Sequence, residues 1–146
     1  MMSVAFYKHN LPGIPGLFAR LIRLVTWGPY SHCELVFTES ISYSSSIEDG
    51  GTRFKDIQFQ ADHWDFVGVP AECRENVARA FCIAEKGSAY DFPGVFRFLV
   101  PIIGQSPERW FCSEVVCAAL QAGGLFPGVK PWKVSPNRLY KMMAKR

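Results

Sequence analysis

The chain has 146 residues, of which 49% are hydrophobic and 20% charged, a balance typical of a folded domain rather than a disordered chain. The net charge is +3, and the Lys and Arg residues are scattered apart from a short tail at residues 141–146, which argues against nucleic-acid binding. No apolar run approaches the roughly 20 residues that cross a bilayer.

The five cysteines form neither a CxxC pair nor a metal-spaced cluster, so we expect no metal and no cofactor. The N-terminal residues lack the charged-then-apolar layout of a signal peptide. We therefore expect reduced thiols in a cytoplasmic protein. Repeats and linkers are absent from the sequence, which predicts a single domain over residues 1–146.

Short strands are predicted through the first half of the chain, where β-branched and aromatic runs are separated by turn residues. Alternation along residues 30–37 puts His32 and Glu34 on one face of a strand and Cys33 on the other. This strand forms a hairpin with the next run, and later runs complete a meander. The predicted strands cover residues 4–7, 30–37, 41–47, 53–59 and 65–69.

Helices are predicted where apolar residues recur at helical spacing. One starts at Cys112 and stops at Gly123, and the last follows the N-cap and first-turn pair Ser135-Pro136. A less regular aromatic segment over residues 90–101 leads towards the Cys112 helix. The predicted helices cover residues 15–25, 72–86, 112–122 and 136–143.

Cys112 is the candidate nucleophile. At the start of a helix, unpaired N–H groups and the helix dipole stabilise negative charge, which lowers the pKa of a thiol. The alternative interpretation is an inert buried cysteine, because free Cys is among the most buried residue types.

A cysteine hydrolase also needs a base, and His32 is the candidate among three histidines. His32 opens a strand after a Gly-Pro bend, where a side chain is both rigidly held and at the rim of a sheet. His9 lies in a terminal segment and His63 in a predicted surface connection. The alternative for His32 is a strand histidine bonded to neighbouring backbone.

The group that orients the imidazole should lie beside His32, and two residues compete for this role. Ser44 is on the returning strand, where a cross-strand neighbour belongs. Glu34 shares the face of His32 and would hold an imidazolium better, but residues two apart are about 7 Å apart along a strand. Glu114 fits better as a first-turn acid favoured by the helix dipole.

An oxyanion also needs hydrogen-bond donors. The backbone N–H of Cys112 at the helix start is one natural donor. Tyr30 and Ser113 are the candidates for further contacts to the substrate or the oxyanion, although a packed aromatic is the alternative for Tyr30.

Three short stretches resemble a known family. They read YSHCELV at residues 30–36, GSAYDF at residues 87–92 and WFCSEVV at residues 110–116. In content and order they are similar to motifs of the circularly permuted, papain-like branch of the NlpC peptidase/amidase superfamily. In that branch the catalytic His comes first, at the head of a strand, and the Cys comes last, at the start of a helix.

The resemblance implies an α+β, permuted papain-like fold, in which a small antiparallel barrel-like sheet packs against helices. It implies Cys112 as nucleophile and His32 as base. In lecithin:retinol-acyltransferase-like relatives the third polar residue comes twelve positions after the His, which is Ser44 here. The family more often has an acid, a His or an amide at that position.

The leading hypothesis is therefore a cysteine hydrolase that cleaves an amide through a covalent acyl-enzyme. The expected partners are a peptide, a cell-wall fragment or another acyl or amide substrate. Two alternatives use the same scaffold: a lipid acyl hydrolase or acyltransferase, and a non-catalytic module that binds a peptide or glycan. An intracellular protease or deamidase aimed at other proteins would use the same chemistry.

Overall fold

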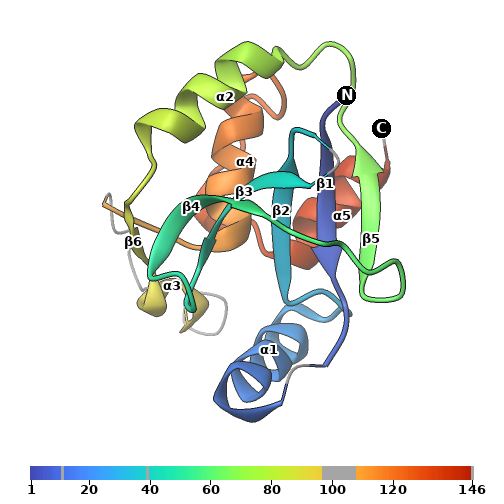
Figure 1. The fold of residues 1–146 in the computed structure, drawn as a ribbon, viewed down its shortest axis with the longest axis vertical. Helices are drawn as coiled ribbons and strands as arrows, with labels where there is room; N and C mark the ends of the chain where they lie inside the picture. The colour runs from blue at the N-terminus through green and yellow to red at the C-terminus, as the bar shows by residue number, and fades with distance from the viewer. Residues whose placement is uncertain (11, 39, 97–107, 146) are drawn as a thin grey trace.

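The computed structural model describes residues 1–10, 12–38, 40–96 and 108–145, and it has an α+β architecture (Figure 1). Its strands are β1 (Ser3–Tyr7), β2 (His32–Val36), β3 (Ile41–Ser46), β4 (Gly51–Asp56), β5 (Trp64–Gly68), β6 (Ala89–Tyr90) and β7 (Arg109–Trp110). Its α-helices are α1 (Gly13–Thr26), α2 (Glu75–Ala84), α3 (Phe92–Phe96), α4 (Cys112–Ala122) and α5 (Pro136–Ala144), with a 3₁₀ turn at Pro131–Lys133.

The four predicted helices and five predicted strands are confirmed to within three residues at their ends. The predicted irregular segment contains β6 and α3, which are too short to leave a periodic pattern in sequence. Residues 97–101 of that segment lie outside the described residues. Within the described chain, no helix combines the length and apolarity of a membrane span.

The described strands form one mixed sheet in the order β5-β1-β2-β3-β4-β6-β7. The sheet is antiparallel except for the pair β6–β7, so the expectation of a purely antiparallel sheet is wrong at that pair. The predicted meander is confirmed for β2, β3 and β4 but is wrong for its last strand, because β5 pairs with β1 rather than with β4. The outer edge of β4 is taken by β6, where Gly51 pairs with Ala89, and β5 fills the open edge of β1.

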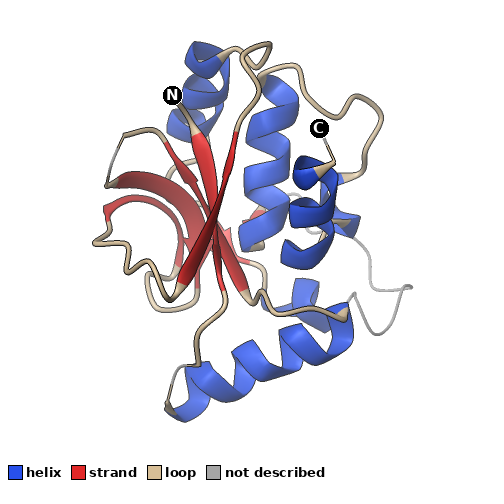
Figure 2. Cartoon of the chain, turned by 90° about the vertical axis from the view of Figure 1, so that its right-hand side faces the viewer, coloured by secondary structure: helices blue, strands red, loops and turns tan. Residues whose placement is uncertain are grey.

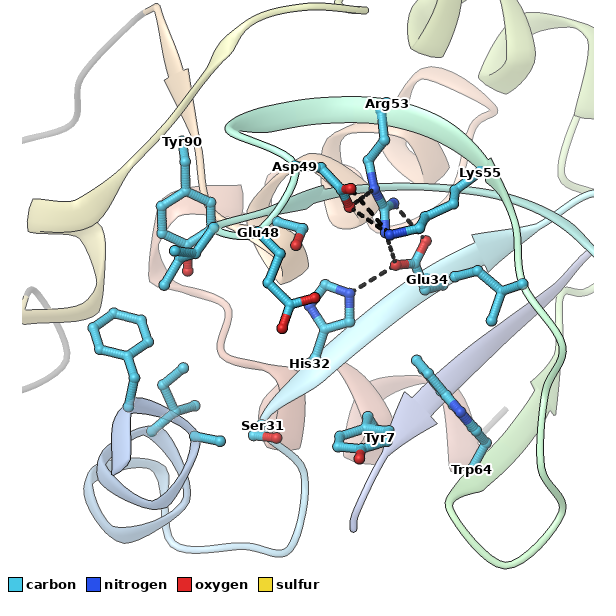
Figure 3. Close-up of a pocket in the computed structure, with 16 residues that line it drawn as sticks. Tyr7, Ser31, His32, Glu34, Glu48, Asp49, Arg53, Lys55, Trp64 and Tyr90 are labelled. Carbon is cyan, nitrogen blue, oxygen red and sulfur yellow. Dashed lines mark hydrogen bonds and ion pairs between the residues drawn. The ribbon is translucent and has the colours of Figure 1, made fainter. Parts of the chain in front are cut away.

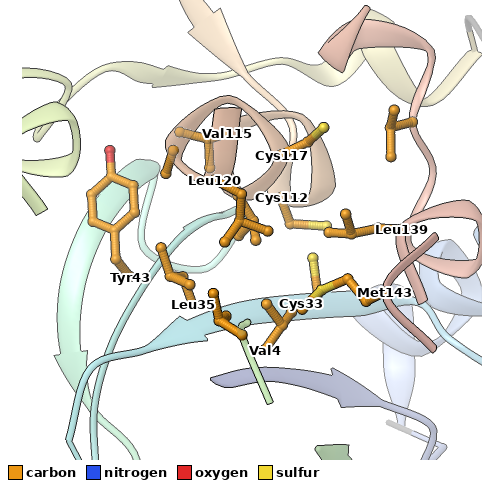
Figure 4. Close-up of a cluster of buried hydrophobic side chains, with 14 of the residues drawn as sticks. Val4, Cys33, Leu35, Tyr43, Cys112, Val115, Cys117, Leu120, Leu139 and Met143 are labelled. Carbon is orange, nitrogen blue, oxygen red and sulfur yellow. The ribbon is translucent and has the colours of Figure 1, made fainter. Parts of the chain in front are cut away.

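Helices α4 and α5 lie on one face of the sheet, and α1 crosses one end of it (Figure 2). The first nine residues of α4 are all buried, because the helix packs against α2, β2 and β3 on several sides. The core under α4 contains Val4, Leu35, Tyr43 and Leu120 (Figure 4). Burial of this surface anchors the helix that carries Cys112.

The start of α5 is fixed to the bend that precedes β2. Ser135 is the predicted N-cap, and its Oγ accepts the N–H of Arg138 at 3.1 Å. The buried Asn137 accepts the N–H of Tyr30 through Oδ1 at 2.9 Å. Its Nδ2 donates to the Tyr30 carbonyl at 2.9 Å and to Thr26 Oγ1 at 2.6 Å. One side chain therefore holds the backbone that leads into His32.

We predict that Asn137→Ala lowers the free energy of unfolding by about 2–4 kcal/mol, because it leaves buried backbone groups of Tyr30 without their partner. Urea denaturation followed by circular dichroism measures the loss. The matched control is Asn10→Ala, which removes one exposed hydrogen bond from Arg23 and should change stability by less than about 0.5 kcal/mol. Equal losses in the two variants would contradict this role of Asn137.

Candidate functional site

The imidazole of His32 is held by a carboxylate from its own strand. His32 Nε2 lies 2.7 Å from Glu34 Oε1. The two residues are the first and third of β2, and their side chains lean towards each other on one face. Positions i and i+2 are about 7 Å apart along a strand, but these two side chains are long enough to meet.

The Glu34 carboxylate is fully buried and accepts further hydrogen bonds from two neighbouring strands. Arg53 on β4 donates to both of its oxygens, with Nη1 at 2.8 Å from Oε2 and Nη2 at 2.6 Å from Oε1. Ser42 Oγ on β3 donates to Oε2 at 3.0 Å. A forked guanidinium fixes both the position and the plane of a carboxylate. Arg53 was not among the predicted site residues.

These contacts keep Glu34 ionised. Burial by itself would raise the pKa of Glu34, but the hydrogen bonds and charges of His32 and Arg53 lower it to about 2. The arrangement therefore places a permanent negative charge against one nitrogen of His32. Nδ1 is the ring nitrogen left for another partner.

Cys112, the first residue of α4, is the group that raises the pKa of His32 most strongly. Removal from water would lower the pKa of His32, but the charge and hydrogen bond of Cys112, followed by those of Glu34, raise it to about 9. Burial likewise opposes a charged sulfur, yet a hydrogen bond from Cys33 and the imidazole of His32 lower the pKa of Cys112 to about 5. Both shifts favour a thiolate and an imidazolium over two neutral groups.

Cys33 is the second group that supports the charge on Cys112. The two side chains face each other between β2 and α4 (Figure 4). Burial, and then the hydrogen bond with Cys112, raise the pKa of Cys33 well above its usual value, so Cys33 remains a neutral S–H donor. The predicted alternation placed Cys33 and His32 on opposite faces of the strand. It therefore gave no indication that both side chains affect the pKa of Cys112.

A pocket of about 290 Å³ opens beside the imidazole (Figure 3). Phe18, Ala19 and Ile22 of α1 form an apolar wall, while Glu48, Asp49, Arg53 and Lys55 form a charged one. The ring of Trp64 lies 6.3 Å from that of His32. The described residues that line the pocket do not include Cys112, which is 1% exposed.

Ser44 does not orient His32. Its hydroxyl is buried and donates to the carbonyl of Cys33 at 2.7 Å, while Nε2 of the imidazole is bonded to Glu34. The prediction from cross-strand position and from family spacing is therefore wrong for Ser44. The residue that the sequence left as its competitor, Glu34, makes the contact.

Tyr30 and Ser113 also have other partners than a substrate. The Tyr30 hydroxyl donates to Asp65 at 2.7 Å, and its ring packs against Phe6 and Tyr140. The Ser113 hydroxyl is buried and donates to the Val134 carbonyl at 2.6 Å. Both side chains stabilise the fold, so their predicted contacts to substrate or oxyanion are not supported.

The three remaining polar candidates, Glu114, His9 and His63, contact other groups of the protein. The backbone N–H of Phe111 donates to Glu114 Oε2 at 3.3 Å, as expected for an acid in the first turn of a helix. His9 and His63 stack on each other with ring centroids 3.8 Å apart. Among the described residues, His, Cys, Asp and Glu side chains form no group of three that could hold a metal ion.

No family model matches this sequence, and no curated protein matches it.

We predict that Glu34→Gln lowers the free energy of unfolding by about 3 kcal/mol at pH 7, because it leaves the Arg53 guanidinium facing a neutral amide. The folded-state pKa of Glu34 is depressed, so its contribution is present above the usual carboxyl pKa. It is lost as the pH falls towards about 2. The difference between wild type and variant should therefore shrink in acid, as measured by urea denaturation across pH.

Asp49→Asn is the matched control for this prediction. Asp49 also binds Arg53, at 2.7 Å, but it lies at the surface with a side chain that is 25% exposed. Its loss should cost less than about 1 kcal/mol. An equal loss of unfolding free energy in Asp49→Asn and Glu34→Gln would show that the burial of Glu34 does not determine the size of the loss.

Proposed function

We propose that this chain is a cysteine hydrolase that cleaves an amide or peptide bond through a covalent acyl-enzyme. The observation that carries the proposal is the position of His32 between a buried carboxylate, Glu34, and the sulfur of Cys112 at a helix N-terminus. The proposed nucleophile Cys112, base His32 and orienting group Glu34 thus form the chain of interactions that acyl transfer requires.

In the proposed reaction the Cys112 thiolate attacks the carbonyl carbon and the carbonyl π electrons move to oxygen. The C–N bond then breaks as His32 gives its proton to the leaving amine. Water, deprotonated by His32, attacks the resulting thioester and releases the acid and the thiolate. Glu34 keeps its charge throughout and stabilises the imidazolium each time it forms.

The developing oxyanion needs donors that are in place before reaction. The backbone N–H of Cys112 belongs to the first turn of α4, whose leading N–H groups have no partner within the helix. We assign it as one oxyanion donor.

The order of the parts supports a permuted papain-like fold. His32 begins β2, and Cys112 begins α4 eighty positions later on a helix that packs against β2 and β3. All five cysteines lie within the described residues and are free thiols, which supports the proposal of a reducing, cytoplasmic setting.

A non-catalytic binding module is the second candidate, and one observation favours it. Cys112 is almost fully buried, whereas His32 and Tyr90 line the pocket. Hydrolysis requires a substrate carbonyl to reach the sulfur past these side chains. A lipid ester would meet the same thiolate, so the class of substrate is decided by assay.

The first prediction from this proposal concerns the pH dependence of Cys112 alkylation. Iodoacetamide should label Cys112 with an apparent pKa of about 5, far below the roughly 8.5 of an ordinary thiol. His32→Gln should raise that apparent pKa because the imidazolium is lost. Mass spectrometry of peptides identifies the labelled residue at each pH.

Cys73 is the internal control, because burial raises its pKa and it should react only in alkali. Cys112 reacting in step with Cys73 would favour the binding module. An unreactive Cys112 at every pH would show that the sulfur is closed to reagents as well as to substrates.

The second prediction concerns catalysis. Cys112→Ala and His32→Gln should each reduce hydrolysis by at least about a thousandfold, because nucleophile and base act as one unit. The rate should require both the thiolate and the imidazolium, which coexist between pH about 5 and about 9. A panel of fluorogenic peptide amides, with a parallel panel of esters, measures the rates.

Cys73→Ala is the matched control and should keep wild-type rates, since Cys73 lies away from the pocket lining. Hydrolysis that survives Cys112→Ala would overturn the assignment of the nucleophile. Faster ester than amide cleavage across the panel would move the substrate class to lipids or other esters.

A further inference from the structure

Charge is segregated along the sequence in a way that the net value of +3 conceals. All 13 acidic residues fall within residues 34–114, and residues 1–33 and 115–146 contain none. The two acid-free ends hold nine of the 16 basic residues. They are Lys8, Arg20, Arg23, Lys130, Lys133, Arg138, Lys141, Lys145 and Arg146.

The fold joins these two ends. Helix α1, from the N-terminal end, contacts α5, from the C-terminal end. The junction is fixed by Asn137, whose Nδ2 donates to Thr26 Oγ1 at 2.6 Å. Thr26 precedes the exposed Trp27, and Asn137 precedes the exposed Arg138. Two helices without acids therefore meet at one corner of the molecule (Figure 2).

Helix α1 presents large apolar side chains to solvent on its outer side. Leu17, Leu24 and Trp27 are 69%, 74% and 88% exposed. The inner side is already apolar, since Phe18, Ala19 and Ile22 line the pocket. An ordinary surface helix carries polar residues on its outer face, so these exposed side chains need another explanation.

Trp27 is held outward by the backbone. It caps α1 in the left-handed region at φ 53°, a conformation that is uncommon for a bulky residue, and its N–H donates to the Arg23 carbonyl. Leu24 lies one turn earlier, and the exposed Arg20 one turn before that. Three apolar side chains and one cationic side chain thus lie along one exposed strip of α1.

We propose that this strip, which comprises Leu17, Arg20, Leu24 and Trp27, docks onto an anionic lipid bilayer. The apolar side chains enter the interface, while Arg20 on α1 and Arg138 on the adjoining helix α5 face lipid headgroups. Charge complementarity selects this occupant. A second copy would bring one acid-free helix against another, and a nucleic acid would leave the leucines and Trp27 unburied.

The proposal does not depend on the hydrolase assignment, because it concerns the outer side of α1. It has a consequence for the pocket, whose apolar wall is the inner side of the same helix. Docking through the outer side places the pocket next to the membrane surface. Substrates presented at that surface then have a short path to His32.

Vesicle flotation tests the proposal with the full chain. Vesicles of phosphatidylcholine with phosphatidylglycerol should carry the protein upward, and vesicles of phosphatidylcholine alone should carry much less. Leu24→Gln combined with Trp27→Asn should weaken partitioning at least about tenfold. Gln keeps helix propensity and Asn tolerates the left-handed cap, so the fold should survive. Arg20→Glu with Arg138→Glu should abolish the preference for anionic vesicles.

Matched controls come from α2 and the turn that follows it, at the opposite end of the molecule from α1 (Figure 1). Ile83 is 61% exposed, so Ile83→Gln removes an equally accessible apolar side chain, and Lys86→Glu reverses an exposed charge. Both should bind vesicles as wild type does. Equal losses in these controls, or absence of binding to anionic vesicles, would overturn the proposal. So would self-association or oligonucleotide binding that is lost in the strip variants while vesicle binding is unchanged.

Discussion

The Glu34 carboxylate lies at the centre of the candidate site, and the other polar groups are arranged around it. It is buried, yet four hydrogen bonds from three side chains surround its two oxygens, and they keep it charged. An unpaired charge at this depth would be strongly destabilising, so Arg53 and Ser42 are needed for the fold as well as for the site. Through His32 the same charge reaches Cys112, where it favours an ion pair over two neutral groups. The same carboxylate therefore affects both the stability of the fold and the charge state of the candidate site.

The burial of Cys112 has two effects that oppose each other. A dry site strengthens the interactions with His32 and Cys33, which is why the pKa of the thiol falls despite its burial. The same burial limits access, since the pocket reaches the imidazole while the sulfur remains in the core. The same geometry would also suit a module that only binds, so access and reactivity have to be measured separately.

Helix α1 links this pocket to the surface of the molecule. Its inner side supplies apolar pocket wall, and its outer side exposes Leu24 and Trp27 among cations. A helix that is apolar on both sides is stable in water only because one side is buried, and its exposed side favours an apolar or interfacial partner. The position of α1 is fixed through Asn137, which also holds the bend before His32. The exposed face of α1 and the backbone before His32 are thus held by the same side chain, Asn137.

Local pattern in the sequence was enough to place Cys112 at the start of a helix and His32 at the start of a hairpin strand, because periodicity, caps and turns act over a few residues. The sequence also reduced the candidates for the group that orients the His32 imidazole to Ser44 and Glu34. The choice between them depended on side-chain conformation and on the hydrogen bonds that neighbouring strands supply. Arg53 and Cys33 carry no local signal, since their roles arise from strands and a helix that meet only in the folded chain. The hydrogen bond from the Tyr30 hydroxyl to Asp65, which replaces the predicted contact to a substrate or oxyanion, also joins segments that meet only in the folded chain. Tertiary structure likewise decided that β5 pairs with β1 and that the two acid-free ends of the chain meet. Contacts between distant segments depend on packing and on which strand edges are unpaired, and local composition does not determine them.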